Sequence, residues 1–265
     1  MKHKSRDASP LRRFWKRKLL PLLFWLAVWQ GTVWLLMAVK KISTTALVLP
    51  SPLLVAETLA ELVGTAVFWQ TALASLGRIF SGLLVGVLLG TAAAVCTSAW
   101  EWADCILSPA VRVIRATPVA SFILLVILWF PTGQVPVVVS ALMVLPVVWG
   151  NVKRGVAQTD PLLLEVARVY RFGRWKTVRL VYIPSVLPYF ASGCHTALGL
   201  AWKAGVAAEV LCVPRLAIGT QVYFSKIYLE TPALFAWTLV VLTLSFLLEQ
   251  GLGALLGRME KGVKL

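Results

Sequence analysis

The sequence predicts an all-helical protein that spans a membrane six times. Apolar residues make up 59% of the 265 residues and the mean hydropathy is +0.81. Soluble domains are only about 45–50% apolar, so the excess here must face lipid. A helix that crosses a hydrocarbon core of about 30 Å needs about 20 apolar residues, and the chain contains six stretches suited to this. The 12 Trp residues fit the same environment, because indole rings favour the membrane–water interface.

The six predicted spans follow directly from the uncharged stretches. They cover residues 19–39, 71–100, 106–130, 137–150, 187–211 and 231–248. The third and fourth are separated at Pro131 and Pro136, where proline and glycine favour a turn. The first contains 21 uncharged residues with no A-x-A site after it, which is too long for the apolar core of a signal peptide. We therefore expect one membrane domain over residues 19–256.

The net charge of +15 is concentrated at the ends of these spans. Eight of the 26 Lys and Arg residues lie in residues 1–18, seven lie in 153–179, and three lie in 257–265. Such clusters follow the positive-inside rule, so they indicate membrane topology and not nucleic-acid binding. With both termini cytoplasmic, twenty basic residues are inside, counting Arg112 and Arg115 at the inner end of the third span. Four are outside: Lys40, Lys41, Arg215 and Lys226. This predicts a multi-pass protein of the cell membrane, with basic cytoplasmic segments at 1–18 and 257–265.

The sequence contains no pattern that indicates catalysis. The ATP-binding pattern G-x-x-x-x-G-K-[ST] is absent, and neither a Ser/His/Asp set nor a metal-ligand spacing occurs. The four Cys residues lack metal spacing and are expected to act as small apolar residues. We therefore expect a chain that is not an enzyme, with no catalytic residue, no metal and no cofactor of its own.

Residues 151–185, between the fourth and fifth spans, form a long cytoplasmic segment. Asp160 suits a helix N-cap and Pro161 suits the first helical position, so a short helix is predicted over 162–170. Phe172 and Gly173 then break this helix, and a basic amphipathic stretch follows over 174–182. Such a charged element between two spans is either structural packing or a docking element for a cytoplasmic partner.

The same segment resembles the EAA loop of ABC importer permeases. It reads E-V-A-R-V-Y-R-F-G from Glu165, and Pro184 follows Glu165 by 19 residues, as in that family. Two positions depart from the pattern: Val166 replaces alanine, and Arg171 holds the usual glycine position while the glycine is displaced to Gly173. A non-glycine residue at this position predicts a different geometry for the turn. In that family the loop is a coupling helix that docks in a groove of the ATPase subunit. The resemblance assigns this coupling role to Glu165, Ala167, Arg168, Arg171, Phe172, Gly173, Pro184 and Pro188.

The resemblance extends over most of the chain from about Leu49 onward. It is closest to the nitrate/sulfonate/taurine-type permeases, which are binding-protein-dependent transport inner membrane components. The matching motifs are L-P-S-P from Leu49, S-L-G-R from Ser75, R-A-T-P from Arg115, A-L-G-L-A-W from Ala197 and A-A-E ending at Glu209. The resemblance implies a type I ABC importer permease fold, a second permease copy (a homodimer or a homologue), two ATPase subunits that bind ATP and Mg, and an extracytoplasmic solute-binding protein.

The fifth span carries the candidate residues of a translocation pathway. At about 100° per residue, Thr196, Gly199 and Lys203 share one side, with His195 beside them. Lys203 lies about 22 Å along the helix from Pro188, well into the bilayer. A charge there costs at least about 2.5–3.5 kcal/mol, so it should face protein or water. Lining the pathway, forming an ion pair and snorkelling outward are the three alternatives for Lys203. His195 is either a packed histidine or a proton carrier.

Small residues four apart indicate closely packed helices. They occur at Gly82, Gly86 and Gly90 in the second span, and the fifth span carries a similar stripe. Tight packing and a moving helix interface are both compatible with these patterns. Arg78, near the outer end of the second span, is expected to be anchored or ion-paired. The residues of the stripe in the fifth span are Gly193, Ala197, Ala201 and Gly205.

The predicted function is therefore a permease subunit that carries a small solute. A cation in the path favours a small anion such as a sulfonate, taurine or nitrate, and a thiamine precursor or another organic solute stays open. The alternative class is an ion- or proton-coupled secondary transporter that works without an ATPase. It would need acidic residues within the spans, and Glu209 is the main candidate, with Glu249 at an inner end. A non-transporting scaffold has no supporting feature beyond the basic surface.

Overall fold

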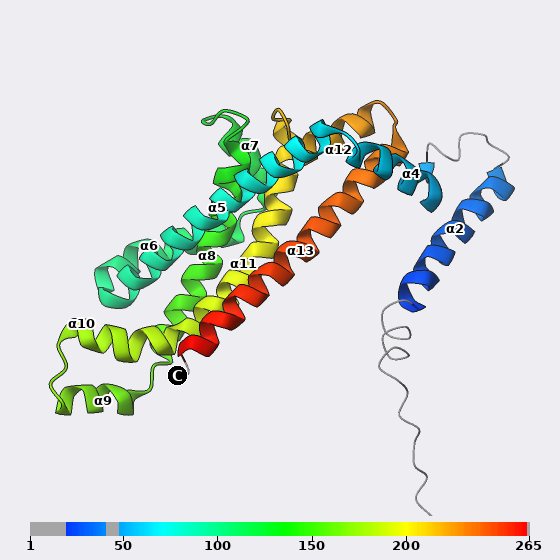
Figure 1. The fold of residues 1–265 in the computed structure, drawn as a ribbon. Helices are drawn as coiled ribbons and strands as arrows, with labels where there is room; N and C mark the ends of the chain where they lie inside the picture. The colour runs from blue at the N-terminus through cyan, green and yellow to red at the C-terminus, as the bar shows by residue number, and fades with distance from the viewer. Residues whose placement is uncertain (1–19, 41–47, 264–265) are drawn as a thin grey trace, which may run out of the picture.

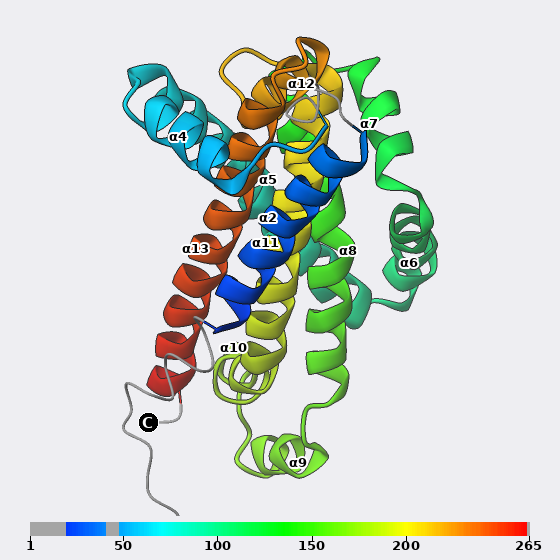
Figure 2. The same ribbon diagram turned by 90° about the vertical axis from the view of Figure 1, so that its right-hand side faces the viewer.

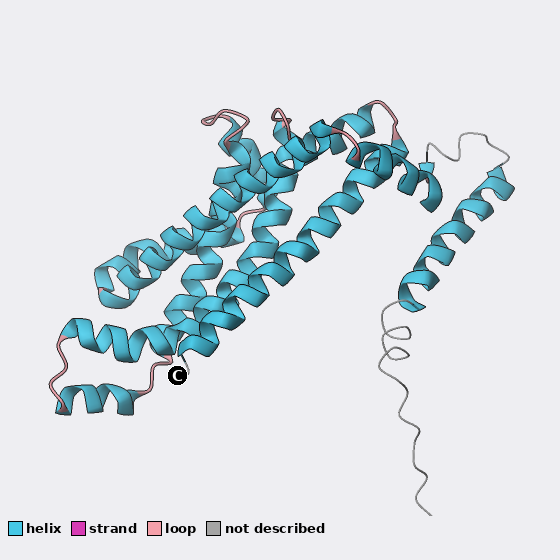
Figure 3. Cartoon of the chain, viewed as in Figure 1, coloured by secondary structure: helices cyan, strands magenta, loops and turns pink. Residues whose placement is uncertain are grey.

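The computed structural model describes residues 20–40 and 48–263, and every regular element in those two ranges is a helix. The predicted all-helical class is confirmed (Figure 3). The basic segment predicted over residues 1–18 lies outside the described residues. The helices are α2 (Leu20–Lys40), α4 (Pro52–Val63), α5 (Ala66–Ala99), α6 (Glu101–Ala116), α7 (Val119–Ile127), α8 (Val135–Ala157), α9 (Pro161–Val169), α10 (Arg174–Thr177), the π-helical turn η2 (Val178–Tyr182), α11 (Ile183–Cys212), α12 (Ile218–Ile227) and α13 (Thr231–Val263).

The long helices α5, α8 and α11 pack together as the centre of the molecule (Figures 1 and 2). Their shared core joins Ile79 and Leu83 of α5, Val144 and Val148 of α8, and Trp202 of α11. Helices α9 and α10 lie at one end of this bundle, together with the C-terminal end of α13 (Figure 1). Helices α4 and α12 lie at the opposite end. We refer to these as the α9 end and the α12 end.

Three described helices are long and apolar enough to cross a membrane, judged by length and composition. They are α5, α8 and the Thr231–Ala254 part of α13. Helices α6 and α7 would make a fourth span if the bent pair counts as one. The apolar part of α2, Leu23–Ala38, is shorter, and α11 has 30 residues but includes Lys203 and Glu209. Helices thus lie at all six predicted positions, while the count of six spans stays a prediction.

The third predicted span is not one helix, and this part of the prediction was wrong. The chain bends by 104° between α6 and α7. Figure 2 shows the two helices on either side of this bend. The break falls at Thr117, which is extended at φ −76° and ψ 130°, and at Pro118. Proline restricts the preceding residue to extended conformations and supplies no N–H for a helical hydrogen bond. The α6 half is amphipathic and is tied to α8 by an ion pair between Asp104 and Lys153.

Helix α2 lies at the outside of the bundle and is held at the α12 end. The indole Nε1 of Trp29 donates to the carbonyl of Pro50, 3.1 Å away, just before α4 begins. Its ring also lies 5.6 Å from the ring of Phe235 on α13. Helix α4 begins at the N-cap Ser51, whose hydroxyl accepts from the N–H of Leu54. These contacts join α2 to the start of α4 and to α13.

Candidate functional site

Helix α9 forms an exposed connection between α8 and α11. Its N-terminus is capped by Asp160, whose side chain accepts from the N–H of Leu162 at 2.8 Å, so the predicted short helix and its cap are confirmed. The helix buries Ala167, while Glu165 and Arg168 are exposed. Its apolar residues also point outward: Leu162 is 66% exposed and Val169 is 78% exposed. The segment therefore presents an apolar and charged surface that nothing in the described chain covers.

The turn after α9 keeps a glycine-like geometry at a residue that is not glycine. Arg171 has φ 51°, in the left-handed region. The N–H of Phe172 donates to the carbonyl of Ala167 at 2.8 Å, and the N–H of Arg171 donates to that of Arg168 at 3.0 Å. These two bonds define a Schellman C-cap, in which the left-handed position is usually glycine. Gly173 has φ −64° and does not take over this role. The turn therefore keeps the geometry expected with glycine, and Arg171 adopts the strained left-handed conformation.

The chain between this turn and α11 is shaped by prolines and aromatic contacts. The ammonium of Lys176 lies 4.2 Å from the ring centroid of Phe172, a cation–π distance. Pro184 lies in the first turn of α11 and cannot donate to the carbonyl four residues before it, and the preceding turn η2 is π-helical. Pro188 lies inside α11. A cavity of about 330 Å³ lies here, lined by Leu164, Ala167, Arg168, Arg171, Phe172, Thr177 and Tyr182.

At the α12 end, Glu209 joins three helices through a buried carboxylate. Its side chain is 0% exposed and accepts from the guanidinium of Arg78 at 3.3 Å. The hydroxyl of Ser75 donates to it at 2.9 Å and the N–H of Gly219 donates to it at 3.1 Å. Ser75 also accepts from the N–H of Ile218. Helices α5, α11 and α12 therefore share one hydrogen-bond network.

The loop between α11 and α12 is built around the same network. Arg78 donates to the carbonyls of Arg215 at 2.7 Å and Leu216 at 3.0 Å. A Cβ at Gly219 would lie 2.5 Å from the Cβ of Glu209, so the close approach requires glycine. Of the two alternatives for Arg78, the structure contains the ion pair. Ser75 and Gly219 were missed by sequence reasoning, although S-L-G-R and A-A-E were both recognised as motifs.

The small residues of α5 lie against α8. A Cβ on Gly82 would lie 2.4 Å from the carbonyl oxygen of Val137, and one on Gly86 would lie 2.6 Å from the Cβ of Val144. Gly90 similarly approaches the carbonyl of Leu145. These contacts allow the two helix backbones to pack closely.

The small residues of α11 have similarly close neighbours. Gly205 approaches Ile79 of α5 and Ser140 of α8, and Gly193 approaches Asn151 of α8. Ala197 and Ala201 are completely buried. The stripe therefore lies on the face of α11 that packs into the bundle.

The candidate pathway residues lie on the outer side of α11. Thr196, Lys203 and His195 are exposed, and Lys203 makes no ion pair with a carboxylate among the described residues. Gly199 is half-buried, and a Cβ on it would lie 3.5 Å from the Oε1 of Glu249 on α13. Thr196 and Lys203 are seven residues apart and so share a helix face. Thr196 lines a cavity of the bundle.

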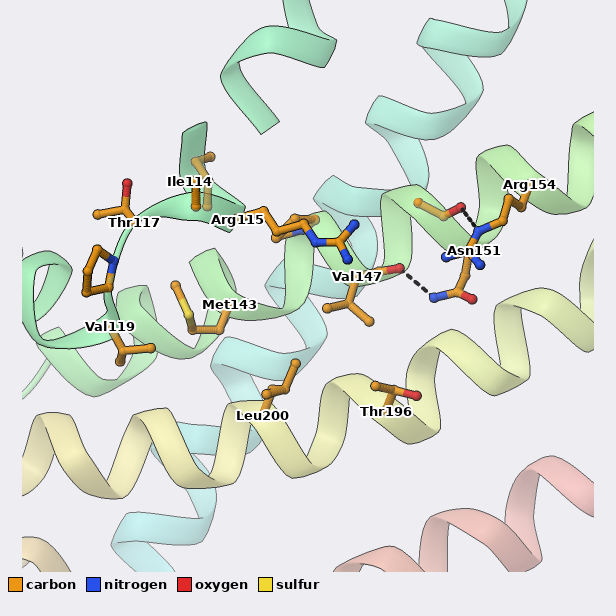
Figure 4. Close-up of a pocket in the computed structure, with 14 residues that line it drawn as sticks. Ile114, Arg115, Thr117, Val119, Met143, Val147, Asn151, Arg154, Thr196 and Leu200 are labelled. Atoms are coloured by element: carbon orange, nitrogen blue, oxygen red, sulfur yellow. Dashed lines mark hydrogen bonds between the residues drawn. The ribbon is translucent and has the colours of Figure 1, made fainter. Parts of the chain in front are cut away.

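That cavity has a volume of about 670 Å³ and lies between the α6–α7 break, α8 and α11. Figure 4 shows Arg115 reaching from the break along α8 toward Asn151, with Thr196 and Leu200 on α11. Arg154 lines the end beside Asn151, and no acidic residue is in the lining. Sequence reasoning missed Arg115, Arg154 and Asn151. The sequence signal for this site was an arginine, Arg115, two residues before the break at Thr117 and Pro118. The full lining is Ile114, Arg115, Ala116, Thr117, Pro118, Val119, Met143, Pro146, Val147, Gly150, Asn151, Arg154, Thr196 and Leu200.

A bundle in which three described helices are long and apolar enough to cross a membrane indicates a helical membrane protein. The chain belongs to the family of binding-protein-dependent transport system inner membrane components, whose sequence profile matches residues 82–261. The predicted resemblance to ABC permeases is confirmed by this match.

Individual relatives are similar over nearly their whole length. The chain is 29% identical over 234 residues to the taurine transport system permease protein of Escherichia coli. This alignment covers 86% of this chain and 84% of that protein. It is 29% identical to the riboflavin transport system permease protein of Chloroflexus aurantiacus, covering 91% and 90% of the two chains. It is 28% identical to the bicarbonate transport system permease protein of a Synechocystis species, covering 86% and 88%.

A solved structure has the same fold. The crystal structure of an amino acid ABC transporter with histidines aligns with a TM-score of 0.62 at 20% identity, covering 77% of this chain and 97% of that chain. This similarity establishes an ABC permease fold for the bundle.

Proposed function

We propose that this chain is the permease subunit of an ABC importer that carries a small anion. In this proposal two permease copies form the pathway, with both termini of each chain in the cytoplasm. Two ATPase subunits bind ATP and Mg and dock on the α9 end, and an extracytoplasmic solute-binding protein delivers the solute to the α12 end. The permease itself has no catalytic role. ATP-driven closure shifts the equilibrium between two packed states of the helices.

The exposed surface of α9 carries the proposed ATPase contact. The helix is fixed at both ends, by the Asp160 cap and by the Schellman turn at Arg171, so its outward face is rigid. Leu162 and Val169 expose large apolar surfaces there, next to the charged Glu165. Exposed apolar residues rimmed by charges indicate a protein–protein contact. Of the coupling residues expected from the EAA-like pattern, Glu165 and Arg168 are exposed on α9, whereas Ala167 is buried and Pro188 lies inside α11.

The charge of the 670 Å³ cavity supports an anionic solute. Two arginines and no acidic residue line it. The similar proteins are named for taurine, for bicarbonate and for riboflavin, so family membership does not decide the solute. The residues of this chain favour an anion of the first two kinds.

The secondary-transporter alternative receives no support from Glu209. Its carboxylate accepts hydrogen bonds from Arg78, Ser75 and the Gly219 N–H, and its side chain is completely buried. A carboxylate that binds a transported cation must be accessible from the pathway. Glu209 is instead a structural link between helices.

Co-purification tests the docking surface. A tagged chain is expected to recover an ATPase from detergent-solubilised membranes, and Leu162→Asp should remove most of it while the permease stays folded. Leu53→Asp on α4 is the matched control, since Leu53 is 70% exposed at the opposite end. Glu165→Lys provides a second test on the charged side of the same helix. Recovery of no ATPase by the unmodified chain, or equal recovery with Leu162→Asp, would refute the proposed docking.

A further inference from the structure

We propose that the cavity beside the α6–α7 break binds an oxyanion group, with Arg115 and Arg154 as its cationic ligands. This rests on the proposed function for the identity of a carried solute, whereas the charge of the site stands on the structure alone. The oxyanion belongs either to the solute, as a sulfonate or carboxylate, or to the headgroup of an anionic lipid. Both sources share the same recognition chemistry.

The two cavity arginines have no carboxylate partner among the described residues, unlike Lys153 and Arg78. Lys153, on the same helix as Arg154, pairs with Asp104, and Arg78 pairs with Glu209. Arg154 donates only to the carbonyl of Gly150 on its own helix, at 3.3 Å, and Arg115 has no hydrogen-bond or ion-pair partner among the described residues. Both arginines are exposed at the cavity, and a pair of cations without a counter-charge attracts anions.

The break in the helix adds to the positive potential. Helix α7 has nine residues and begins at Val119, which lines the cavity, and its N-cap Pro118 provides no side-chain hydrogen bond. The first N–H groups of a helix have no partner within the helix, and the helix dipole makes this end partially positive. Broken membrane helices present such N-termini to anionic groups. Here the helix start and the Arg115 guanidinium belong to the same cavity.

The shape of the cavity suits a small anion with a short organic part. Its volume of about 670 Å³ falls within the range of roughly 300–1,000 Å³ typical of small-molecule sites. Met143, Val147 and Leu200 supply an apolar wall, while Asn151 and Thr196 supply polar groups. A guanidinium binds an oxyanion through two parallel N–H···O bonds.

Thiol labelling at Thr196 measures the charge of the cavity directly. A Thr196→Cys variant is prepared in a background with Cys105→Ser, because Cys105 is the exposed cysteine of the described chain. The full chain, purified with its bound subunits in neutral phosphatidylcholine nanodiscs, is reacted with an anionic sulfonate thiosulfonate reagent and with a cationic ammonium one. The same background without Thr196→Cys supplies the correction for the other cysteines.

The ratio of anionic to cationic labelling rates is expected to fall roughly tenfold in the double variant Arg115→Gln/Arg154→Gln, as expected for two charges removed from a partly enclosed site. Arg112→Gln is the matched control, since Arg112 is on α6 but does not line the cavity. It should leave the ratio unchanged. A ratio that is insensitive to the double substitution, or one that falls equally in the control, would overturn the proposal.

Protection from labelling separates the two sources of the oxyanion. Slower labelling in the presence of taurine, bicarbonate or sulfate assigns the site to a soluble anion. Slower labelling only when phosphatidylglycerol is added to the nanodisc assigns it to a lipid headgroup. Absence of protection by any of these overturns the proposal. The labelling requires neither ATP nor an ATPase, so loss of ATPase co-purification would refute the proposed function without affecting this result.

Discussion

Arg78 on α5 and Glu209 on α11 form an ion pair of 3.3 Å whose carboxylate is completely buried. The guanidinium is bound at the same time to the carbonyls of Arg215 and Leu216, so this one residue links helices α5 and α11 and the loop that leads to α12. The pair is an inter-helix anchor at the α12 end of the bundle.

Removal of the cation from this pair should destabilise the protein strongly. Arg78→Ala leaves the Glu209 carboxylate buried without its counter-charge, which costs about 3–5 kcal/mol in buried pairs. We expect a loss of about 3 kcal/mol, at the lower end because Arg78 is 21% exposed. Unfolding in a denaturing detergent titration measures it. The double variant Arg78→Leu/Glu209→Leu should recover part of the loss, and a single variant as stable as the parent would contradict the anchoring role.

The glycines of α5 differ sharply in what they can tolerate. Gly86→Ala would place a Cβ 2.6 Å from Val144 Cβ and 2.7 Å from the carbonyl oxygen of Ala141, so α5 and α8 must move apart. Such overpacking costs typically about 1–3 kcal/mol. Gly77→Ala on the same helix meets nothing within 4 Å and should be neutral or stabilising. Thermal unfolding of the two variants compares them directly, and equal stability would contradict the close packing of α5 on α8.

The turn after α9 should become more stable when its left-handed residue is glycine. Arg171 has φ 51°, which costs a non-glycine residue roughly 1–2 kcal/mol. Arg171→Gly removes this strain and should increase the protection of the Phe172 N–H against hydrogen exchange, since that group donates to Ala167. Arg171→Ala removes the charge but keeps the strain, so it should give no increase. Gly173→Ala should be tolerated, because its φ is −64° and nothing lies within 4 Å.

Lys203 is expected to matter for transport and not for assembly. It is exposed on α11 and has no carboxylate partner among the described residues, so Lys203→Ala should leave stability and ATPase binding unchanged. Loss of a cation on the proposed path should reduce the initial rate of anion uptake. Uptake equal to that of the parent, with intact assembly, would remove Lys203 from the pathway.

Local signals in the sequence account for much of the architecture. The uncharged runs located the long helices, and Asp160 with Pro161 located α9 to within a residue. The break at Thr117 and Pro118 was overlooked because hydropathy is continuous across it, although proline carried the signal. The strain at Arg171 had a signal in the sequence, because Arg171 holds the usual glycine position of the EAA loop, while the Schellman hydrogen bonds fix its left-handed angle.

The sites that depend on long-range contacts were harder to predict. Glu209 and Arg78 are 131 residues apart, and only the packing of α5 against α11 reveals that they meet. The cavity arginines were interpreted as topological charges, because both lie near predicted cytoplasmic ends. Their placement around one cavity follows from the α6–α7 break, which turns Arg115 toward α8.

ATP-dependent uptake into proteoliposomes tests the central claim most directly. The chain and its co-purified ATPase are reconstituted, and entry of labelled taurine or bicarbonate is measured in the presence of the partner solute-binding protein. The account predicts uptake that requires ATP, persists when a protonophore dissipates the proton gradient, and is lost in Leu162→Asp. Uptake that is driven by an ion or proton gradient without ATP would contradict it.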